Sequence, residues 1–321
     1  MSKFWLRLKI LSAVFIGSFY LVLSQSMAAT ITVNCSSQTI ENALFSAVDG
    51  DRIEVSGTCT ETAVKIDKNR ITLDGGGSAT IEHSGSSPRN LIQITGLNVR
   101  IENFASITGS RVGISVGLGG SARITNNTVN NSGSHGILVA DNGAASIDGN
   151  TIDGNGFHGI RIARNGAAQI FDNTITNNAG LGIHIADSSS GEIRTNTITG
   201  NSSDGILVSS SSAIRLSGGP PPNGPNILEN NGGFGISCFR NASLEVSTAQ
   251  VFGTGAKANS SGDAFIDESC GLRLRGTAVG TIEQEGSVTF ACFHLTQGKL
   301  RIVDSLDECK EEETGLTWDT N

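Results

Sequence analysis

The sequence predicts an all-β solenoid, in which one set of short strands repeats along the chain and stacks on itself. The first observation is the period: from Gly113, four rows of 23 residues follow without a gap, and a fifth row begins at Gly205. The second is that aliphatic residues stand two apart, as in Ile137 and Val139, which puts both side chains on one face of a strand. The third is the recurrence of asparagine at fixed places in successive rows.

Each row is expected to hold three strands. In the second row they fall near residues 136–139, 145–148 and 151–153, separated by turns of Asn, Gly, Asp and Ser. Because the chain returns to its start after 23 residues, each strand should lie about 4.8 Å from its copy in the next row, which forms three parallel sheets. One row buries too little apolar surface to fold alone, so the rows must stack.

Two columns of asparagine mark the turns. They contain Asn127, Asn150, Asn173, Asn196 and Asn226 in one column, and Asn155, Asn178, Asn201 and Asn231 in the other. An asparagine side chain inside a turn can bond to the turns above and below, so we expect amide ladders. The leucine-rich repeat has a similar period, but the upstream half of each row has Gly, Ala and Ser where a convex helix would need leucines.

An amphipathic helix is expected at about 38–49, before the first coil. Its apolar stripe contains Ile40, Ala43, Leu44, Ala47 and Val48. The pair Asp49-Gly50 is the expected end of the helix. Such a helix would cover the open end of the solenoid and shield its core and strand edge from water.

The rows, together with the stretches TIENALFSAVDGDRIEVSGTCTE and RITLDGGGSATIE, resemble the right-handed parallel β-helix, or pectin-lyase-like, superfamily of exported bacterial proteins. The resemblance covers residues 31–239 well and 240–310 weakly. It implies a three-sheet solenoid over residues 30–310, with an N-terminal capping helix and regular coils of about 23 residues over about 113–235. It says little about activity, because this fold hosts many functions.

The six cysteines are expected to form disulfides, because all of them follow the first 29 residues and their number is even. Cys35 and Cys59 bracket the first structural unit and are the expected first pair. The pairing stays open for Cys238, Cys270, Cys292 and Cys309. No CxxC or CxH spacing occurs, so no metal site is predicted from them. Beyond residue 240 the period decays, and we expect irregular disulfide-linked coils over 240–310 and an acidic tail over 311–321.

Residues 1–29 have the order of a secretory signal: a basic start, an apolar run and then small residues. Cleavage is expected near Ala28 or Ala29, which gives a secreted or periplasmic protein without a membrane anchor. Without these residues the chain has 19 basic and 30 acidic side chains, a net charge of −11. That charge argues against nucleic acid and anionic membranes as partners. We expect a monomer.

Histidine recurs at the start of a strand in two rows. In the polygalacturonase group of the same superfamily, the resemblance implies Gly-His-Gly there, Arg-Ile-Lys one coil later, and three aspartates on earlier coils. His135 and His158 match the histidine, and Arg161 begins a partial match to Arg-Ile-Lys, but Gln93 and Ser115 occupy the outward positions of the preceding coils. Glycoside hydrolysis needs two carboxylates, so no complete catalytic motif is present. The histidine position is also filled by Leu181, Asp204 and Phe234, as in a loosely constrained turn.

The outward strip of the same strands contains Leu138, Arg161, His184 and Leu207. It could receive a sugar chain, although few aromatic residues are available to stack on sugar rings. If the protein is an enzyme, His158, Arg161 and His184 are the candidate catalytic residues, and His135 is a candidate binding residue.

Three further features have two interpretations each. Asp148 and Asp153 flank the Asn150 turn and could bind Ca²⁺ with a carbonyl, or could cap the turn. The column Asp141, Arg164 and Asp187 predicts a surface ion ladder. The proline-rich insertion at 217–226 should project as a fixed loop, either as the wall of a groove or as a tolerated insertion.

Three functions follow from these patterns. The first is an exported β-helix protein that binds or presents to polysaccharide or cell-envelope material without catalysis, which the missing carboxylates favour. The alternative is a polysaccharide lyase, epimerase or hydrolase that acts along the outer face of the first sheet. A third, an accessory protein similar to periplasmic β-helix partners of copper enzymes, finds few Met or His ligands in this chain.

Overall fold

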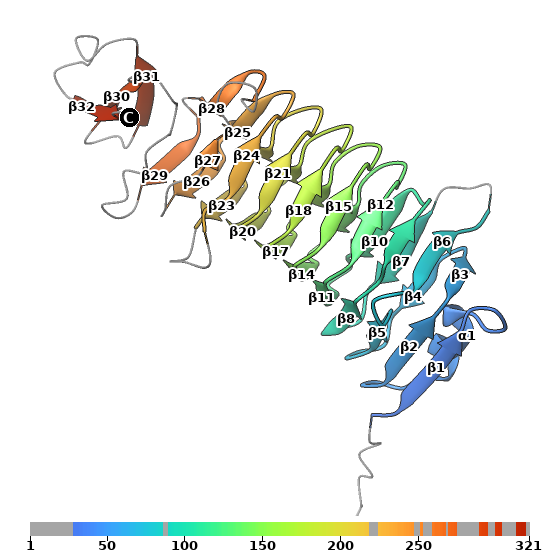
Figure 1. Ribbon diagram of the computed structural model, residues 1–321. Coiled ribbons are helices and arrows are strands. Elements are labelled where there is room, and N and C mark those ends of the chain that lie inside the picture. Colours follow the sequence, from blue (N-terminus) through green and yellow to red (C-terminus); the bar gives the residue numbers. More distant parts are fainter. Residues whose placement is uncertain are drawn as a thin grey trace, which may run out of the picture.

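The computed structural model describes residues 28–85, 89–217, 224–246, 251–252, 259–267, 269–274, 289–294, 299–303 and 313–318. Over most of this length the chain winds as a solenoid, with three parallel sheets that run along its axis (Figure 1). The three-sheet solenoid predicted from the sequence is confirmed.

Sheet A has eleven strands: β1 (Thr30–Asn34), β2 (Arg52–Ser56), β5 (Thr72–Asp74), β8 (Val99–Glu102), β11 (Ser121–Thr125), β14 (Ala144–Asp148), β17 (Ala167–Phe171), β20 (Ser190–Arg194), β23 (Ala213–Leu216), β26 (Ser243–Val246) and β29 (Gly271–Leu274). Sheet B has nine: β3 (Thr58–Glu61), β6 (Thr80–His83), β9 (Ser106–Thr108), β12 (Thr128–Asn130), β15 (Thr151–Asp153), β18 (Thr174–Thr176), β21 (Thr197–Thr199), β24 (Ile227–Glu229) and β27 (Val251–Phe252).

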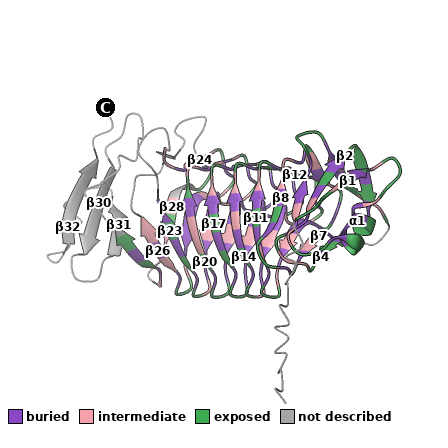
Figure 2. Cartoon of the chain, turned by 90° about the horizontal axis from the view of Figure 1, so that it is seen from below, coloured by how far each residue is buried: buried purple, intermediate pink, exposed green. Residues whose placement is uncertain are grey.

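Sheet C also has nine strands: β4 (Val64–Ile66), β7 (Asn90–Ile94), β10 (Val112–Val116), β13 (Ile137–Val139), β16 (Ile160–Ile162), β19 (Ile183–Ile185), β22 (Ile206–Val208), β25 (Phe234–Cys238) and β28 (Gly262–Ile266). The three strands expected in the second row are therefore β13, β14 and β15. In the regular rows each residue pairs with the residue 23 positions later, as Ile137 does with Ile160, so like side chains stack on like. The core is built from these aliphatic columns, which are fully buried (Figure 2).

Both asparagine ladders are present and buried. In the first, Nδ2 of Asn150 donates to Oδ1 of Asn173 at 3.0 Å and to a main-chain carbonyl of the preceding row. The ladder continues across the insertion, because Nδ2 of Asn196 donates to Oδ1 of Asn226 at 3.0 Å. The second ladder extends one row further than predicted, to Asn259. The inserted residues therefore leave the stacking of the rows intact.

In the rows without the insertion, the residue before the first-ladder asparagine has a left-handed backbone. The φ angles are 56° at Asn126, 65° at Gly149, 53° at Asp172 and 57° at Thr195. Asparagine, glycine and aspartate tolerate this conformation, whereas a β-branched residue such as threonine is strained in it. The turn composition of the rows thus follows from one backbone requirement.

The capping helix α1 (Ile40–Ser46) is shorter than the predicted 38–49. Thr39 caps its N-terminus by accepting from the amide of Asn42, and the chain is extended again at Ala47. The helix ends early because the ammonium of Lys68 binds the main-chain carbonyls of its last turn, among them that of Leu44. The expected stop at 49–50 was therefore wrong, and Val48 lies outside the buried stripe with 47% exposure.

The disulfide between Cys35 and Cys59 is confirmed, and it ties the chain after β1 to β3. A second disulfide joins Cys238 in β25 to Cys270. The side chain of Cys292 and the whole of Cys309 lie outside the described residues. None of the helices within the described residues has the length and apolar character needed to span a membrane.

The last third of the chain differs from the prediction in two ways. The parallel sheets continue in register through β28 and β29, so the coils up to residue 274 are more regular than expected. The predicted acidic tail at 311–321 was wrong for β32 (Glu313–Trp318), which pairs antiparallel with β30 (Thr289–His294) beside β31 (Lys299–Val303). Threonine, leucine and tryptophan in 313–318 favour a strand in spite of the acidic neighbours. Residues 1–27 and 218–223, which hold the predicted signal and most of the insertion, lie outside the described residues.

Candidate functional site

The outer face of sheet C carries one column of outward side chains, one from each strand. This column consists of Lys65, Gln93, Ser115, Leu138, Arg161, His184, Leu207, Ser237 and Phe265. Apart from Ser237, which is buried, each lies between two inward aliphatic positions, so the alternation of the strand points it away from the core. The strip predicted from the sequence is therefore a real surface column. Its members include two cations and no carboxylate.

Four aromatic rings come together on this face: those of the predicted site residues His135, His158 and His184, and that of Phe157. We call these four residues, together with Arg161, the histidine cluster. The ring centroids of Phe157 and His158 lie 3.8 Å apart, and those of His135 and His158 lie 5.1 Å apart. The ring of His184 meets that of His158 edge-on at 5.0 Å. The two turns that precede β13 and β16 therefore place their rings over the strands β16 and β19, and the ring of Phe157 is 45% exposed.

His158 has a structural role within the cluster. Its side chain is buried, and Nδ1 accepts a hydrogen bond from the main-chain amide of Leu181 at 3.0 Å, which assigns the proton of the neutral ring to Nε2. Burial, together with the neighbouring His184, His135 and Arg161, lowers the pKa of His158 to about 2. Two rows later, the carboxylate of Asp204 accepts a hydrogen bond from the main-chain amide of Phe234, in the same position of the next row. This column thus supplies acceptors that fix the following turn.

His135 and His184 have free nitrogens. Burial, with Arg161 as a neighbour, lowers the pKa of each to about 4. The Nδ1 atoms of both rings are buried and make no hydrogen bond to any described residue. A buried polar atom of this kind is usually satisfied by a ligand or a water molecule. At neutral pH these rings are uncharged hydrogen-bonding groups beside a guanidinium.

The cation of the cluster is only weakly neutralised. Nη2 of Arg161 lies 3.5 Å from Oδ2 of Asp187, and the arginine side chain is one quarter exposed. The predicted ion ladder is half correct, because Arg164 pairs with Asp141 at 2.6 Å. Its other expected partner, Asp187, pairs with Arg161 of the outward column instead.

A second aromatic group lies further along sheet C, and we call it the phenylalanine group: Phe234, Phe239 and Phe265. The ring of Phe265 lies 5.4 Å from that of Phe234 and 6.4 Å from that of Phe239, centroid to centroid. The guanidinium of Arg240 lies over the ring of Phe239 at 5.3 Å. Phe157 and the phenylalanine group thus give sheet C aromatic side chains, although only 5% of the chain is aromatic. Phe234 falls at the histidine position of the row alignment, whereas Phe239 and Phe265 lie in rows whose length differs from 23 residues, so the sequence gives only a weak signal for them.

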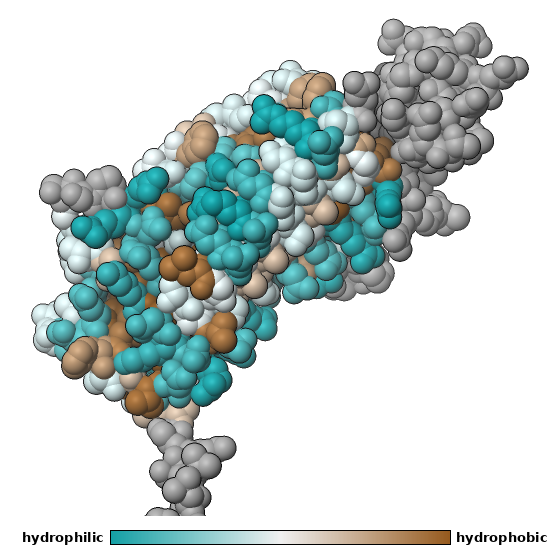
Figure 3. Space-filling model, turned by 180° about the vertical axis from the view of Figure 1, so that it is seen from behind, coloured by the Kyte–Doolittle hydropathy of each residue, from teal (hydrophilic) through white to brown (hydrophobic). Residues whose placement is uncertain are grey.

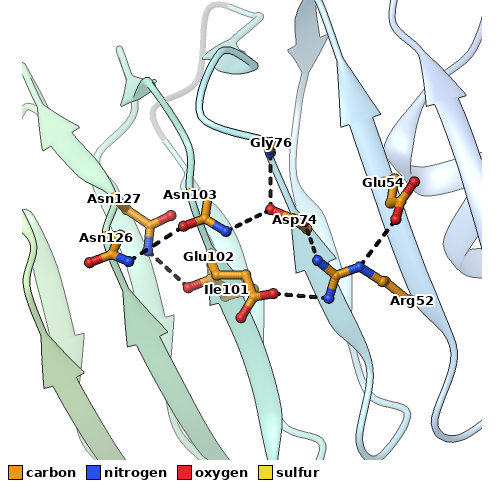
Figure 4. A network of polar contacts seen from close by, with 9 residues as sticks. All are labelled: Arg52, Glu54, Asp74, Gly76, Ile101, Glu102, Asn103, Asn126 and Asn127. Carbon is orange, nitrogen blue, oxygen red and sulfur yellow. Dashed lines mark hydrogen bonds and ion pairs between the residues drawn. The ribbon is translucent and has the colours of Figure 1, made fainter.

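Three carboxylates of the first coils, those of Glu54, Asp74 and Glu102, lie on sheet A, where they form an ion network with Arg52 (Figure 4). Arg52 binds Glu102 at 3.0 Å and Glu54 at 3.3 Å, and it also binds Asp74. Asp74 in turn accepts a hydrogen bond from the side-chain amide of Asn103. These acids are engaged in linking neighbouring strands and lie on a different sheet from the histidine cluster.

The two aspartates considered for Ca²⁺ are also engaged. Asp148 pairs with Arg123 at 3.3 Å, and Asp153 accepts from Thr176 at 2.7 Å and from Asn177 at 2.8 Å. Within the described residues, no group of three or more His, Cys, Asp or Glu is placed to hold a metal ion. Calcium binding at this turn stays a prediction.

A family model described as "right handed beta helix region" matches residues 112–282, more than half of the chain. The chain belongs to this right-handed β-helix family. Its regular rows and both aromatic groups of sheet C lie within the matched residues.

Among solved structures, the chain is similar to the A-module of the mannuronan C-5 epimerase AlgE4 from Azotobacter vinelandii, with 13% identity over 75% of this chain and 92% of that chain and a TM-score of 0.42. It is similar to an alginate lyase from Paenibacillus sp. str. FPU-7, with 12% identity, 78% and 99% coverage and a TM-score of 0.40. A mutant of the periplasmic alginate epimerase AlgG gives 14% identity, 76% and 82% coverage and a TM-score of 0.41. No curated protein sequence matches the chain.

Proposed function

We propose that this protein binds an acidic polysaccharide along the outer face of sheet C and does not convert it. One observation carries the proposal: the outward column of sheet C contains cations and no carboxylate, in a chain whose net charge is −8. An outward column that contains cations and no carboxylate, on a protein with a negative net charge, is the most favourable place for an anionic ligand.

The histidine cluster supplies what a sugar acid needs. The half-exposed ring of Phe157 offers a flat apolar surface for the carbon–hydrogen face of a sugar ring. Arg161 offers two parallel donors for a carboxylate. The rings of His135 and His184, uncharged at neutral pH, lie beside it.

The phenylalanine group extends this surface along the solenoid. Arg161 and Phe265 are separated by four strand spacings in the register of sheet C, or about 19 Å. An extended chain of several sugar units could contact both groups at once, and each contact raises the effective concentration of the other. Long chains should therefore bind more tightly than short ones.

The side chains of the site argue against hydrolysis. Hydrolysis needs an acid and a second carboxylate at a set separation, whereas the nearby Asp187 and Asp204 are engaged with Arg161 and the amide of Phe234. The lowered pKa of His158 makes that ring a poor proton acceptor. A lyase or epimerase is the second candidate, because the neutral ring of His184 is next to Arg161 in register.

Export fits the same reading of the chain. The two disulfides are stable in an oxidising compartment, and the first 29 residues have the order of a secretory signal. We propose a secreted or periplasmic monomer that meets its polysaccharide outside the cytoplasm.

The test is a binding and turnover panel with the purified protein. Alginate and pectate represent acidic chains, and dextran represents a neutral one. Arg161→Gln and Phe157→Ala should each weaken acidic-chain binding about tenfold, while Arg123→Gln on sheet A serves as the control and should not. Equal binding of neutral and acidic chains, or an equal loss in the control, would refute the proposal. Formation of unsaturated ends that His184→Ala abolishes would establish the second candidate instead.

A length series tests the extended surface separately. Phe265→Ala should lower the affinity for acidic oligosaccharides of eight sugar units (octamers) about tenfold and leave the affinity for those of two units (dimers) unchanged. Phe171→Ala, which removes a phenylalanine from sheet A, is the matched control. If octamers and dimers bind equally well to the unmodified protein, the phenylalanine group is not part of the site, although the histidine cluster remains so.

A further inference from the structure

Asp51 is a buried carboxylate that lacks a cation. The residue is 3% exposed, and it lies at the turn between α1 and β2. Its Oδ2 accepts from the main-chain amide of Val48 at 2.8 Å, and its Oδ1 accepts from the main-chain amide of Ala29 at 2.8 Å. None of the ion pairs between described residues includes Asp51. A buried charge of this kind is costly unless an opposite charge meets it.

The main-chain nitrogen of Ala29, which donates to Asp51, is held in place by the start of sheet A. The carbonyl of Ala29 accepts from the amide of Arg52 at 2.8 Å, and the pairing of β1 with β2 begins at the next residue, Thr30. The preceding residue, Ala28, is exposed. Among the described residues, the chain therefore enters the ladder of sheet A after Ala28.

The bond between Ala28 and Ala29 also has small residues where a signal peptidase needs them. Ser26 and Ala28 stand three positions and one position before it. The sequence alone left cleavage after Ala28 or after Ala29 open. The two choices differ in the structure, because cleavage after Ala29 would remove the nitrogen that Asp51 binds.

We propose that the Ala28–Ala29 bond is the processing site and that the new amino terminus forms an ion pair with Asp51. A signal peptidase adds water across this bond, so that Ala28 gains a carboxylate and the nitrogen of Ala29 leaves as an amine. At neutral pH that amine carries a proton, since an α-amino group has a pKa of about 8. The ammonium then replaces the amide donor on Oδ1 of Asp51 and supplies the missing charge. Processing thereby strengthens the attachment of β1 and the capping helix to the first coil.

The position of the cut is tested on the full chain. Residues 1–321 are expressed in a bacterium that exports them, and the mass of the exported product is measured. The expected product lacks residues 1–28. A product that begins at Thr30, or at any other residue, overturns the proposal.

The ion pair is tested on the chain that begins at Ala29, with a free amine or with the same amine acetylated. Acetylation keeps an N–H donor and removes the charge, so it should lower the Tm by an amount on the order of 5 °C. The effect should vanish in Asp51→Asn and persist in Asp49→Asn, whose carboxylate is exposed and bound to Asn69. Equal Tm values for the free and acetylated forms overturn the proposal without any variant. The result is independent of whether sheet C binds polysaccharide.

Discussion

Replacement of Asn173 by alanine should destabilise the solenoid strongly, although the residue lies far from either end. Its side chain is 1% exposed and makes four hydrogen bonds. Oδ1 accepts from the main-chain amide and from Nδ2 of Asn150, and Nδ2 donates to the carbonyl of Ile147 and to Oδ1 of Asn196. Alanine removes all four.

The partners are affected unequally, and this sets the magnitude. Nδ2 of Asn150 keeps its bond to the carbonyl of Ile124, and Oδ1 of Asn196 keeps the amide of residue 173. The main-chain amide of Asn150 has no substitute, and a buried donor left unpaired costs about 1–3 kcal/mol. With about 1 kcal/mol for each of the other lost bonds, the expected loss is about 4–6 kcal/mol in the free energy of unfolding.

Equilibrium unfolding in urea measures the loss. Gln169→Ala, an exposed position on the adjacent strand β17, is the control and should change the free energy of unfolding by less than about 0.5 kcal/mol. Asn173→Asp separates hydrogen bonding from packing, because it keeps the shape and turns the two donated bonds into contacts between oxygens. If the alanine variant costs no more than the Gln169 control, or if aspartate is tolerated as well as asparagine, the ladder does not stabilise the fold as argued.

Three further changes have outcomes that the structure fixes. Acidification should destabilise the protein: the pKa values of His135, His158 and His184 are lowered in the fold from an unfolded value of 6.5. Stability is therefore complete above that value and falls with pH below it, by about 2 kcal/mol per histidine at pH 5, and urea midpoints at pH 7 and 5 measure the fall. Thr195→Asn should raise the free energy of unfolding by about 1 kcal/mol, because asparagine tolerates the left-handed turn better; a lower urea midpoint would contradict this. Cys270→Ser should lower the free energy of unfolding by about 3–4 kcal/mol in non-reducing buffer. The matching control is a reducing buffer, in which the variant and the unmodified protein should be equally stable.

The regular rows were predictable because one residue type recurs wherever the backbone or the core demands it. Ile147 and Ile152 face the same interior, and Asn150 between them must bond to its copies, so the period alone gives strands, register and ladder. Where a neighbour in space decides the outcome, the sequence was silent. The ammonium of Lys68, from another coil, binds the carbonyl of Leu44 at the end of the capping helix. Asp187 forms its ion pair with Arg161 and not with the predicted partner Arg164.

The candidate site was only partly predictable for the same reason. Arg161 and His184 share the outward column of the row alignment, and His158 lies three residues before Arg161 in the turn column, so their meeting on sheet C followed from the period. Phe265 comes from a row whose length differs, and its approach to Phe234 depends on the register that β28 adopts against β25. The side chains that meet on a surface built from rows of unequal length therefore cannot be predicted from the sequence until the pairing of the strands is known.

On the face shown in Figure 3, hydrophobic residues are dispersed among hydrophilic ones and do not merge into one large patch. The polysaccharide site proposed for sheet C relies on a few rings and cations, which the strand register holds at fixed heights along the axis.

Because each regular row pairs with the next at a constant offset of 23 residues, a row can be duplicated or deleted without disturbing its neighbours. An event between the histidine cluster and the phenylalanine group would move the two groups apart, or together, by one strand spacing. The distance between the two groups is therefore a quantity that gene duplication can change in whole steps. Related chains with one more or one fewer row would select longer or shorter segments of the same polymer.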